Sequence, residues 1–341
     1  MKANRLITLI SVILLTLAAT GCGTSRMTFN TLVPPPMSVD SSIETVLIVD
    51  RAVPGSDHQR SPLQGEGAET RERAARQHIL DGLRYSLGNS GRFVVVRATE
   101  EYTGSTTGIE FPDPLSEEII GILANRYGAD AIVALETFSS EFIPTGGSGR
   151  LREGSILPEF SARGVATVRC GFRMYSVADR LPVDEFRFSH TNEWRSGGNI
   201  ISGTINTLAV RAEAINSASN RAGIMYGERI APKWIAVSRE YYRRGGGNRF
   251  LAEGARMMQL NDWDRAIEAL TRATETGRRR GRGRAAHNLA VVHEIIGDLH
   301  TAKEWATVAW GVYREKRSRN YGNILTRRII AEEELRSESR E

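Results

Sequence analysis

The chain has 341 residues, of which 40% are hydrophobic and 25% charged, and these values exclude an intrinsically disordered protein. Its length exceeds what one hydrophobic core usually organises, so two domains are expected. The formal net charge of +5 equals the charge of one run, Arg278 to Arg284, which contains five arginines. The rest of the chain therefore sums to zero, which excludes a uniformly basic protein.

The N-terminus has the pattern of a bacterial export signal. Lys2 and Arg5 precede an apolar stretch, Leu6 to Ala19, that is too short to span a bilayer and is typical of a cleaved signal peptide. The following "LAATGC" resembles the lipobox of bacterial lipoproteins, which implies a lipid with acyl chains such as palmitate on Cys22. By the same resemblance, Gly23 in place of Asp favours the outer membrane, facing the periplasm. The alternative is a plain secretory peptide with Cys22 unmodified.

Residues 43–138 alternate between β-branched apolar runs and amphipathic stretches. Strands are predicted at 43–51, 92–98 and 131–138, and helices at 68–91 and from Asp113, with Pro114 in the first turn, to about Gly128. The order strand, helix, strand, helix, strand is typical of a sheet covered by helices.

Residues 144–242 begin with a polar stretch, 144–158, that predicts a long loop. The alternating stretches "GVATVRCGFRMYSV" and "EFRFSHTNEW" flank "ADRLP" and predict a β-hairpin. A helix from about Ile205 to Tyr242, interrupted or kinked near Pro232, should follow. The fold class is therefore α+β, a mixed α/β N-terminal domain with a partly antiparallel sheet, followed by an all-α helical domain.

The C-terminal third contains an internal repeat with a period of 36 residues. "GARMMQLNDWDRAIEALTRA" and "AVVHEIIGDLHTAKEWATVA" align without gaps, and small residues recur at the same places. This pattern resembles the tetratricopeptide repeat (TPR), in which small residues let two antiparallel helices approach closely. The expected structural positions are Gly254, Trp263, Ala266, Ala273, Ala290, Gly297, Ala302 and Ala309. A concave face made by the first helix of each repeat would bind a partner through Arg256, Met257, Met258 and His293.

These patterns predict four segments. They are a signal peptide at 1–21, a lipidated tether with a first short strand at 22–42, the mixed α/β domain at 43–242 and the TPR-like domain at 243–341.

The arginine run "RRRGRGR" lies between the two predicted repeats. Nucleic-acid binding would require interleaved aromatic residues or a helix that reads bases, and the run has neither. We therefore expect no nucleic-acid partner and interpret the run as a solvent-exposed loop. Contact with anionic lipid headgroups is the alternative.

Motifs for catalysis or metal binding are weak. His293, Glu294 and His300 lack the spacing of a zinc helix, and a P-loop, a G-x-S-x-G elbow and a C-x-x-C motif are absent from the sequence. Cys170 alternates with apolar residues and is expected in the core. Asp130 and Glu136, at either end of a predicted strand, could form an acid pair, but Asp130 opens that strand and is better interpreted as a turn residue. We therefore predict no catalytic residue, no metal site and no cofactor apart from the lipid on Cys22.

The segment "YGERIAPKWIAVSREYYRRGGGNRFLAEGARMMQLNDWDRAIE" resembles DUF6340, a family of uncharacterised Bacteroidota lipoproteins. The matching positions are Ala231, Pro232, Trp234, Trp263 and Ala266. The resemblance implies that the family covers most of the mature chain, and it implies no activity.

Two functions are compatible with these features. The first is a lipid-anchored envelope scaffold, not an enzyme, that binds a protein partner through the TPR-like helices. The second is an envelope hydrolase or carbohydrate-binding protein that uses the loops at 99–114 or 144–158. The second would require Asp184, His190 or Glu193 to converge with carboxylates of those loops.

Overall fold

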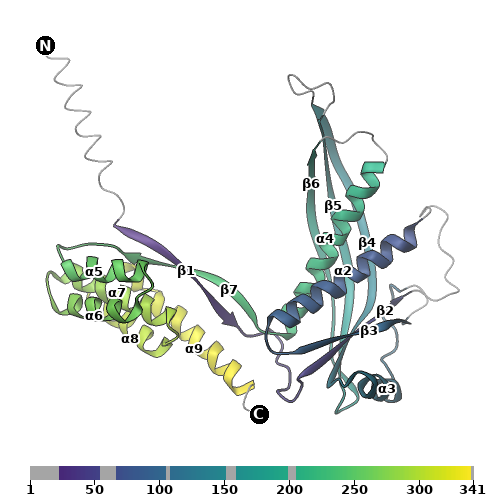
Figure 1. Ribbon diagram of the computed structural model, residues 1–341, viewed down its shortest axis with the longest axis horizontal. Coiled ribbons are helices and arrows are strands. Elements are labelled where there is room, and N and C mark those ends of the chain that lie inside the picture. The colour runs from purple at the N-terminus through teal and green to yellow at the C-terminus, as the bar shows by residue number, and fades with distance from the viewer. Residues whose placement is uncertain (1–22, 54–66, 105–107, 151–158, 199–204, 339–341) are drawn as a thin grey trace. The chain divides into compact units, whose positions relative to one another are not determined.

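The computed structural model describes residues 23–53, 67–104, 108–150, 159–198 and 205–338 (Figure 1). The chain forms two compact units. The α/β unit spans Pro34–Lys233, and the helical unit combines residues 23–33 with Trp234–Arg336. The division between the two compact units thus lies at 233–234, before the expected 242–243, because the strand that ends at Tyr242 pairs with a strand at the N-terminus. Cys22 lies outside the described residues.

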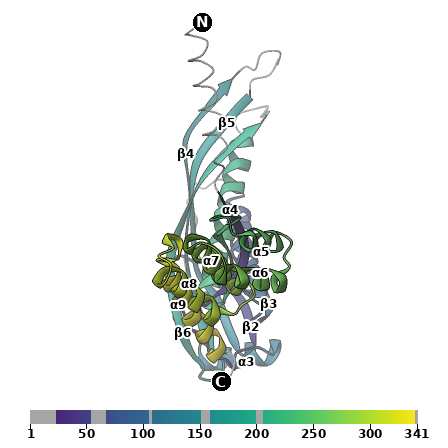
Figure 2. The same ribbon diagram turned by 90° about the vertical axis from the view of Figure 1, so that its left-hand side faces the viewer.

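A five-stranded mixed sheet forms the centre of the α/β unit. Its order is β3 (Val94–Thr103), β2 (Thr45–Val53), β4 (Ala131–Arg150), β5 (Glu159–Ser176) and β6 (Leu181–Gly198). β2 pairs in parallel with β3 and β4, whereas β4, β5 and β6 pair antiparallel. The predicted fold class and the β5–β6 hairpin are confirmed. The strands β4 and β5 run far beyond β2 (Figure 2).

Different helices cover the two faces of the sheet. Val46 and Ile48 of β2 belong to the same core as α2 (Ala68–Asn89) and α4 (Ile205–Ile230), whereas Leu47 and Val49 pack with α3 (Glu117–Tyr127). Since side chains alternate along a strand, consecutive residues of β2 must be apolar to serve both faces. This explains the unbroken apolar run from Val46 to Val49.

Glycines permit close packing of α2 against α4. A Cβ at Gly223 would lie 1.9 Å from the carbonyl oxygen of Ile79, and a Cβ at Gly82 would lie 2.0 Å from that of Asn220. Real Cβ atoms do not approach backbone so closely, so only glycine fits at the two crossing points. The two helices can therefore pack backbone against backbone over the sheet.

The polar stretch at 144–158 is only partly a loop, contrary to prediction. β4 continues through Pro144 to Arg150, and β5 begins at Glu159, so residues 144–150 pair with residues 159–164. A register shift between Pro144 and Gly146 accommodates the proline, which has no N–H to donate. Antiparallel pairing supplies the hydrogen bonds that this glycine-rich sequence would otherwise make with water.

Two predicted helix boundaries were wrong. α3 begins at Glu117 instead of Asp113, because Ser116 caps the helix by accepting a hydrogen bond from the Ile119 N–H. The helix from Ile205 ends at Ile230, two residues before Pro232. Residues beyond that proline form β7 (Lys233–Tyr242), which pairs with β1 (Thr24–Val33).

The helical unit consists of this two-stranded ribbon and a series of helices. They are α5 (Arg249–Gln259), α6 (Trp263–Glu275), α7 (Arg279–Ile295), α8 (Leu299–Gly311), the 3-10 turn η2 (Lys316–Ser318) and α9 (Tyr321–Glu338). The internal repeat corresponds to two helical hairpins, α5–α6 and α7–α8. Asp262 caps α6 and Asp298 caps α8 in the same way, each accepting a hydrogen bond from the N–H three residues later.

Small residues occupy the contact between the two helices of each hairpin and the turn that joins them. A Cβ at Gly254 would lie 2.6 Å from Leu270 Cγ, and Gly297 has a φ of 87°, which favours glycine at the turn. Trp263 is half-buried against the helical core. The five alanines of the predicted repeat positions are fully buried, namely Ala266, Ala273, Ala290, Ala302 and Ala309.

The arginine run is helical, which corrects its interpretation as a loop. Arg278 is the N-cap of α7, and the remaining residues form its first turns. Gly281 and Gly283 are buried, and a Cβ at Gly283 would lie 2.6 Å from Tyr313 Cβ. Glycine therefore lets the start of α7 pack closely on its neighbours, and tertiary contacts offset its low helix propensity.

Candidate functional site

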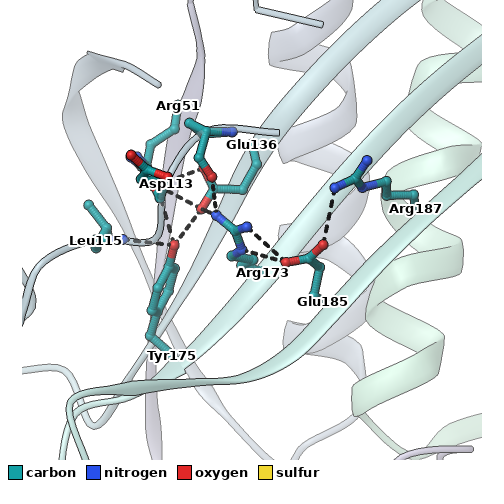
Figure 3. A network of polar contacts seen from close by, with 9 residues as sticks. Arg51, Asp113, Leu115, Glu136, Arg173, Tyr175, Glu185 and Arg187 are labelled. Carbon is teal, nitrogen blue, oxygen red and sulfur yellow. Dashed lines mark hydrogen bonds and ion pairs between the residues drawn. The ribbon is translucent and has the colours of Figure 1, made fainter. Parts of the chain in front are cut away.

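A cluster of buried charged side chains lies on the α3 side of the sheet (Figure 3). Arg51 of β2 donates from Nη1 to both carboxylate oxygens of Glu136 on β4, at 2.8 and 2.7 Å. Tyr175 of β5 donates its hydroxyl to Glu136 Oε1 at 2.6 Å, and Arg173 Nη1 lies 4.0 Å from the same oxygen. Glu136 and Tyr175 have no exposed surface. Three strands thus bring one carboxylate and two guanidinium groups together away from water.

The same cluster holds the segment that precedes α3. Arg173 donates to the carbonyl oxygen of Pro112 at 2.6 Å, and Arg51 donates to the carbonyl oxygen of Asp113 at 3.3 Å. The backbone N–H of Leu115 donates to the Tyr175 hydroxyl at 3.2 Å. Because these backbone groups already have partners in the cluster, the helix begins only after them, at Glu117.

The cluster is closed and fully partnered. Burial raises the pKa of Glu136, although Arg51, Tyr175 and Arg173 oppose the shift, and burial next to Glu136 raises the pKa of Tyr175 to about 12. A general acid or base must reach a substrate within hydrogen-bond distance. Glu136 has no exposed surface for such a contact, so we assign the cluster to the stability of the three inner strands of the sheet and not to catalysis.

Asp130 and Glu136 do not form an acid pair. Asp130 accepts hydrogen bonds from the backbone N–H groups of Glu44 and Thr45, at 3.1 and 2.8 Å, whereas Glu136 belongs to the buried cluster. Asp130 is therefore a connector residue at the start of β4.

The three side chains required by the enzyme hypothesis lie in separate environments. Asp184 pairs with Arg229 at 2.9 Å and accepts a hydrogen bond from Tyr226 at 3.0 Å. Glu193 is exposed, with its carboxylate 3.8 Å from the Arg195 guanidinium, and the pKa of the half-buried His190 is lowered by burial and by Arg221. Across the described ranges, no group of three His, Cys, Asp or Glu side chains could hold a metal ion.

Two polar hollows of the α/β unit lie beside the expected 99–114 loop. One has a volume of about 340 Å³ and lies between α2, α4 and β4, with Ser139, Ser140 and Asn216 among its lining residues. The other has a volume of about 380 Å³ and lies between α2 and β3, with Arg97 and Glu101 among its lining residues. Both volumes are at the lower end for small-molecule sites. Residues 105–107 and 151–158 of the predicted loops lie outside the described residues.

A second buried carboxylate ties the helical unit together. Glu294 of α7 accepts from Arg239 of β7 at 2.7 Å at each oxygen, and it also binds Arg328 and Tyr321 of α9. Burial by itself would raise the pKa of Glu294, but the hydrogen bonds from Arg239, Tyr321 and Arg328 lower it below its usual value. Arg328 also donates to Thr31 of β1 at 2.7 Å. Glu294 therefore contributes to holding the β1–β7 ribbon against α7 and α9.

The predicted partner-binding residues have different environments. Arg256 is exposed, and Met257 is half-buried against the helical core. His293 is half-buried, with Nδ1 3.3 Å from Asp298 Oδ2. Met258 is fully buried and cannot touch a partner, so this part of the prediction was wrong.

Two exposed apolar residues complete a repeated surface. Leu260 is 71% exposed and Ile296 is 44% exposed, and each occupies the C-cap of the first helix of its hairpin. Since residues three apart share a helix face, Leu260 lies beside Met257 and Ile296 lies beside His293. α5 and α7 are neighbours. We call these four residues the α5–α7 face. The 36-residue alignment already pairs Leu260 with Ile296, so the sequence contained this signal.

The C-terminal helices match a known family model. DUF6340, a domain of unknown function, matches residues 252–327, which include Trp263 and Ala266. The match begins after Ala231, Pro232 and Trp234, so it covers less of the chain than the resemblance implied.

A second family model covers most of the remaining chain. DUF8603, also described as a domain of unknown function, matches residues 43–242, more than half of the sequence. The chain belongs to the DUF8603 family. The DUF8603 match includes the sheet, the buried Glu136 cluster and β7, and it ends directly before the arginine-rich segment and α5. No curated protein matches this DUF8603 chain.

Several solved structures are similar to part of this DUF8603 protein. The hypothetical protein CT253 from Chlamydia trachomatis is 10% identical, with a TM-score of 0.23, over 55% of this chain and 96% of that one. A putative neuraminyllactose-binding hemagglutinin homolog from Helicobacter pylori is 9% identical, with a TM-score of 0.27, over 57% and 86%. The lipoprotein GNA1162 from Neisseria meningitidis is 13% identical, with a TM-score of 0.20, over 52% and 99%.

Proposed function

We propose that this protein is a lipid-anchored component of the bacterial cell envelope. The N-terminal pattern supports the proposal, since a short apolar stretch leads directly to Cys22 in a lipobox-like sequence. Acyl chains on Cys22 would hold the protein at the outer membrane, facing the periplasm. Among the described helices, none is long and apolar enough to cross a membrane.

The anchor has a direct test. The Cys22→Ala variant should move from the membrane fraction to the soluble fraction of cells, and metabolic labelling with palmitate should be lost. Membrane association that persists in this variant would count against the anchor.

We further propose that the anchored protein is a scaffold that binds another protein through its TPR-like hairpins. The α5–α7 face supports this, because exposed apolar side chains recur at the same position of two successive hairpins. Exposed apolar side chains that adjoin one another on a surface are typical of protein-binding sites. The separate partners of Asp184, Glu193 and Glu136 favour a scaffold over a hydrolase.

Site-specific crosslinking in intact envelopes tests the scaffold. A photoreactive residue in place of Arg256, which is exposed beside the α5–α7 face, should yield a discrete crosslinked protein. The double variant Leu260→Ser and Ile296→Ser should abolish that product. The matched control is Val312→Ser with Ile330→Ser, which removes two other exposed apolar side chains from the same unit. A product that survives the first pair, or no discrete product at all, would contradict the proposal.

A further inference from the structure

The positive charge of the protein is concentrated in the helical unit. Residues 23–33 and 234–336 contain 21 basic and 13 acidic side chains, a net charge of +8, although the whole chain carries only +5. Eight of these basic residues lie on two adjoining segments, the one that leads into α5 and the start of α7. We call five of the eight the arginine face, namely Arg244, Arg249, Arg278, Arg280 and Arg284.

The two segments of the arginine face touch each other. A Cβ at Gly246 would lie 3.0 Å from the backbone nitrogen of Gly281, and Arg284 donates from Nη1 to the carbonyl oxygen of Arg244 at 3.1 Å. Arg284 also lies with its guanidinium 4.5 Å from the ring centre of Tyr242. The positive charges are therefore gathered by tertiary packing, with sequence separations of up to 40 residues.

The arginine face lies where the chain enters the helical unit. The backbone N–H of Arg243 donates to the carbonyl oxygen of Gly23 at 2.8 Å. Gly23, Arg244, Arg249 and Arg284 line one open hollow of about 450 Å³. Consecutive Cα atoms are about 3.8 Å apart, so the proposed lipid attachment at Cys22 is covalently next to this hollow.

The arginines of this face have no acidic partners. In the part of the chain that the structure describes, none of the five forms an ion pair with a carboxylate, whereas Arg272 and Arg317 of the same unit pair with Glu268 and Glu240. Arg244, Arg249, Arg278 and Arg280 are also exposed. A group of unpaired guanidinium groups repels itself, and an anionic surface removes that repulsion.

We infer that the arginine face binds anionic lipid headgroups of the leaflet to which the chain is anchored. The inference builds on the proposed lipid anchor, because only the anchor brings a membrane to this surface. Phosphate groups suit guanidinium donors, and clustered arginines beside a membrane attachment are drawn to anionic lipids within a Debye length. The contact would fix the orientation of the helical unit relative to the membrane, whereas the lipid anchor alone would let it rotate.

Vesicle binding without the anchor tests this inference. The mature chain with Cys22→Ser is sedimented with phosphatidylcholine vesicles, with and without phosphatidylglycerol, at low and high salt. We expect binding only to the anionic vesicles, and weaker binding at high salt. Arg244→Glu, Arg249→Glu and Arg280→Glu together should weaken that binding at least about tenfold.

The matched control reverses Arg256, Arg265 and Arg327 to Glu. These residues are exposed in the same unit, and the variant has the same net charge as the test variant. It should bind within about twofold of the parent, since charges away from the contact are screened. Equal loss in both variants, or no preference for anionic vesicles, would overturn the inference. The test omits Cys22, so its failure would leave the anchor proposal standing, and release of Cys22→Ala from membranes concerns the anchor alone.

Discussion

Arg51 and Glu136 are 85 residues apart in sequence, yet Arg51 Nη1 lies within 2.8 Å of both carboxylate oxygens of Glu136. Glu136 has no exposed surface. Removing one member of a buried pair leaves the other charge uncompensated, which is more costly than losing the pair itself.

Glu136→Gln should therefore destabilise the α/β unit by about 3–5 kcal/mol. Chemical denaturation followed by circular dichroism measures this change. Glu141→Gln is the control, since Glu141 pairs with Arg169 at 3.5 Å on the exposed part of the sheet and should contribute less than about 1 kcal/mol. Similar losses for the two variants would mean that the buried cluster is not a major source of stability.

Gly223→Ala should separate α2 from α4. The added Cβ would lie 1.9 Å from the Ile79 carbonyl oxygen, so backbone must move, at a cost of about 1–3 kcal/mol. Gly121→Ala in α3 is the matched control, because no atom lies within 4 Å of its Cβ position and alanine favours the helix by up to about 1 kcal/mol. Thermal unfolding should thus shift in opposite directions for the two variants.

The helical unit should lose stability as the pH falls below about 6.5, because of His287. His287 Nδ1 lies 2.8 Å from Ser318 Oγ and Nε2 lies 2.9 Å from the Glu240 carbonyl oxygen, and burial lowers the pKa of the ring. The unfolded state then binds the proton more readily than the folded state. Stability is therefore present above the unfolded pKa and is lost as the pH falls towards the folded pKa.

The pH effect is measured as the free energy of unfolding between pH 7.5 and 5, with a slope of at most about 1.4 kcal/mol per pH unit for one group. His287→Phe should flatten this dependence, although it also lowers stability at pH 7.5. His300→Gln, at an exposed position of α8, should leave the dependence unchanged. An unchanged slope in His287→Phe would assign the pH dependence to other groups.

The Cys170 thiol should not react with thiol reagents in the folded protein. It is 3% exposed in the sheet core, and burial raises the pKa of its thiol. In the Cys22→Ala background, a thiol reagent should react only after denaturation. Adding Ser189→Cys on the exposed face of β6 should give one fast-reacting thiol under native conditions. Rapid native reaction without that addition would contradict the buried position.

Local sequence was sufficient for the elements whose residues carry their own signals. The β-branched run around Val46 predicted β2, and the aspartates at 262 and 298 mark the starts of α6 and α8. The 36-residue repeat predicted which alanines are buried, because helix–helix contact restricts size at each period. Signals of this kind act within one or two turns of chain, so one sequence contains them completely.

Only tertiary structure decided the features that depend on distant partners. Residues 234–242 form a strand because β1, more than 200 residues earlier, pairs with them. The glycine-rich arginine run is helical because Gly281 and Gly283 fit against packed neighbours. Glu136 is a buried cluster member and not a catalytic acid because Arg51 and Tyr175 reach it from other strands. Pairing, close packing and charge compensation act through space, and they override the local preferences that one sequence displays.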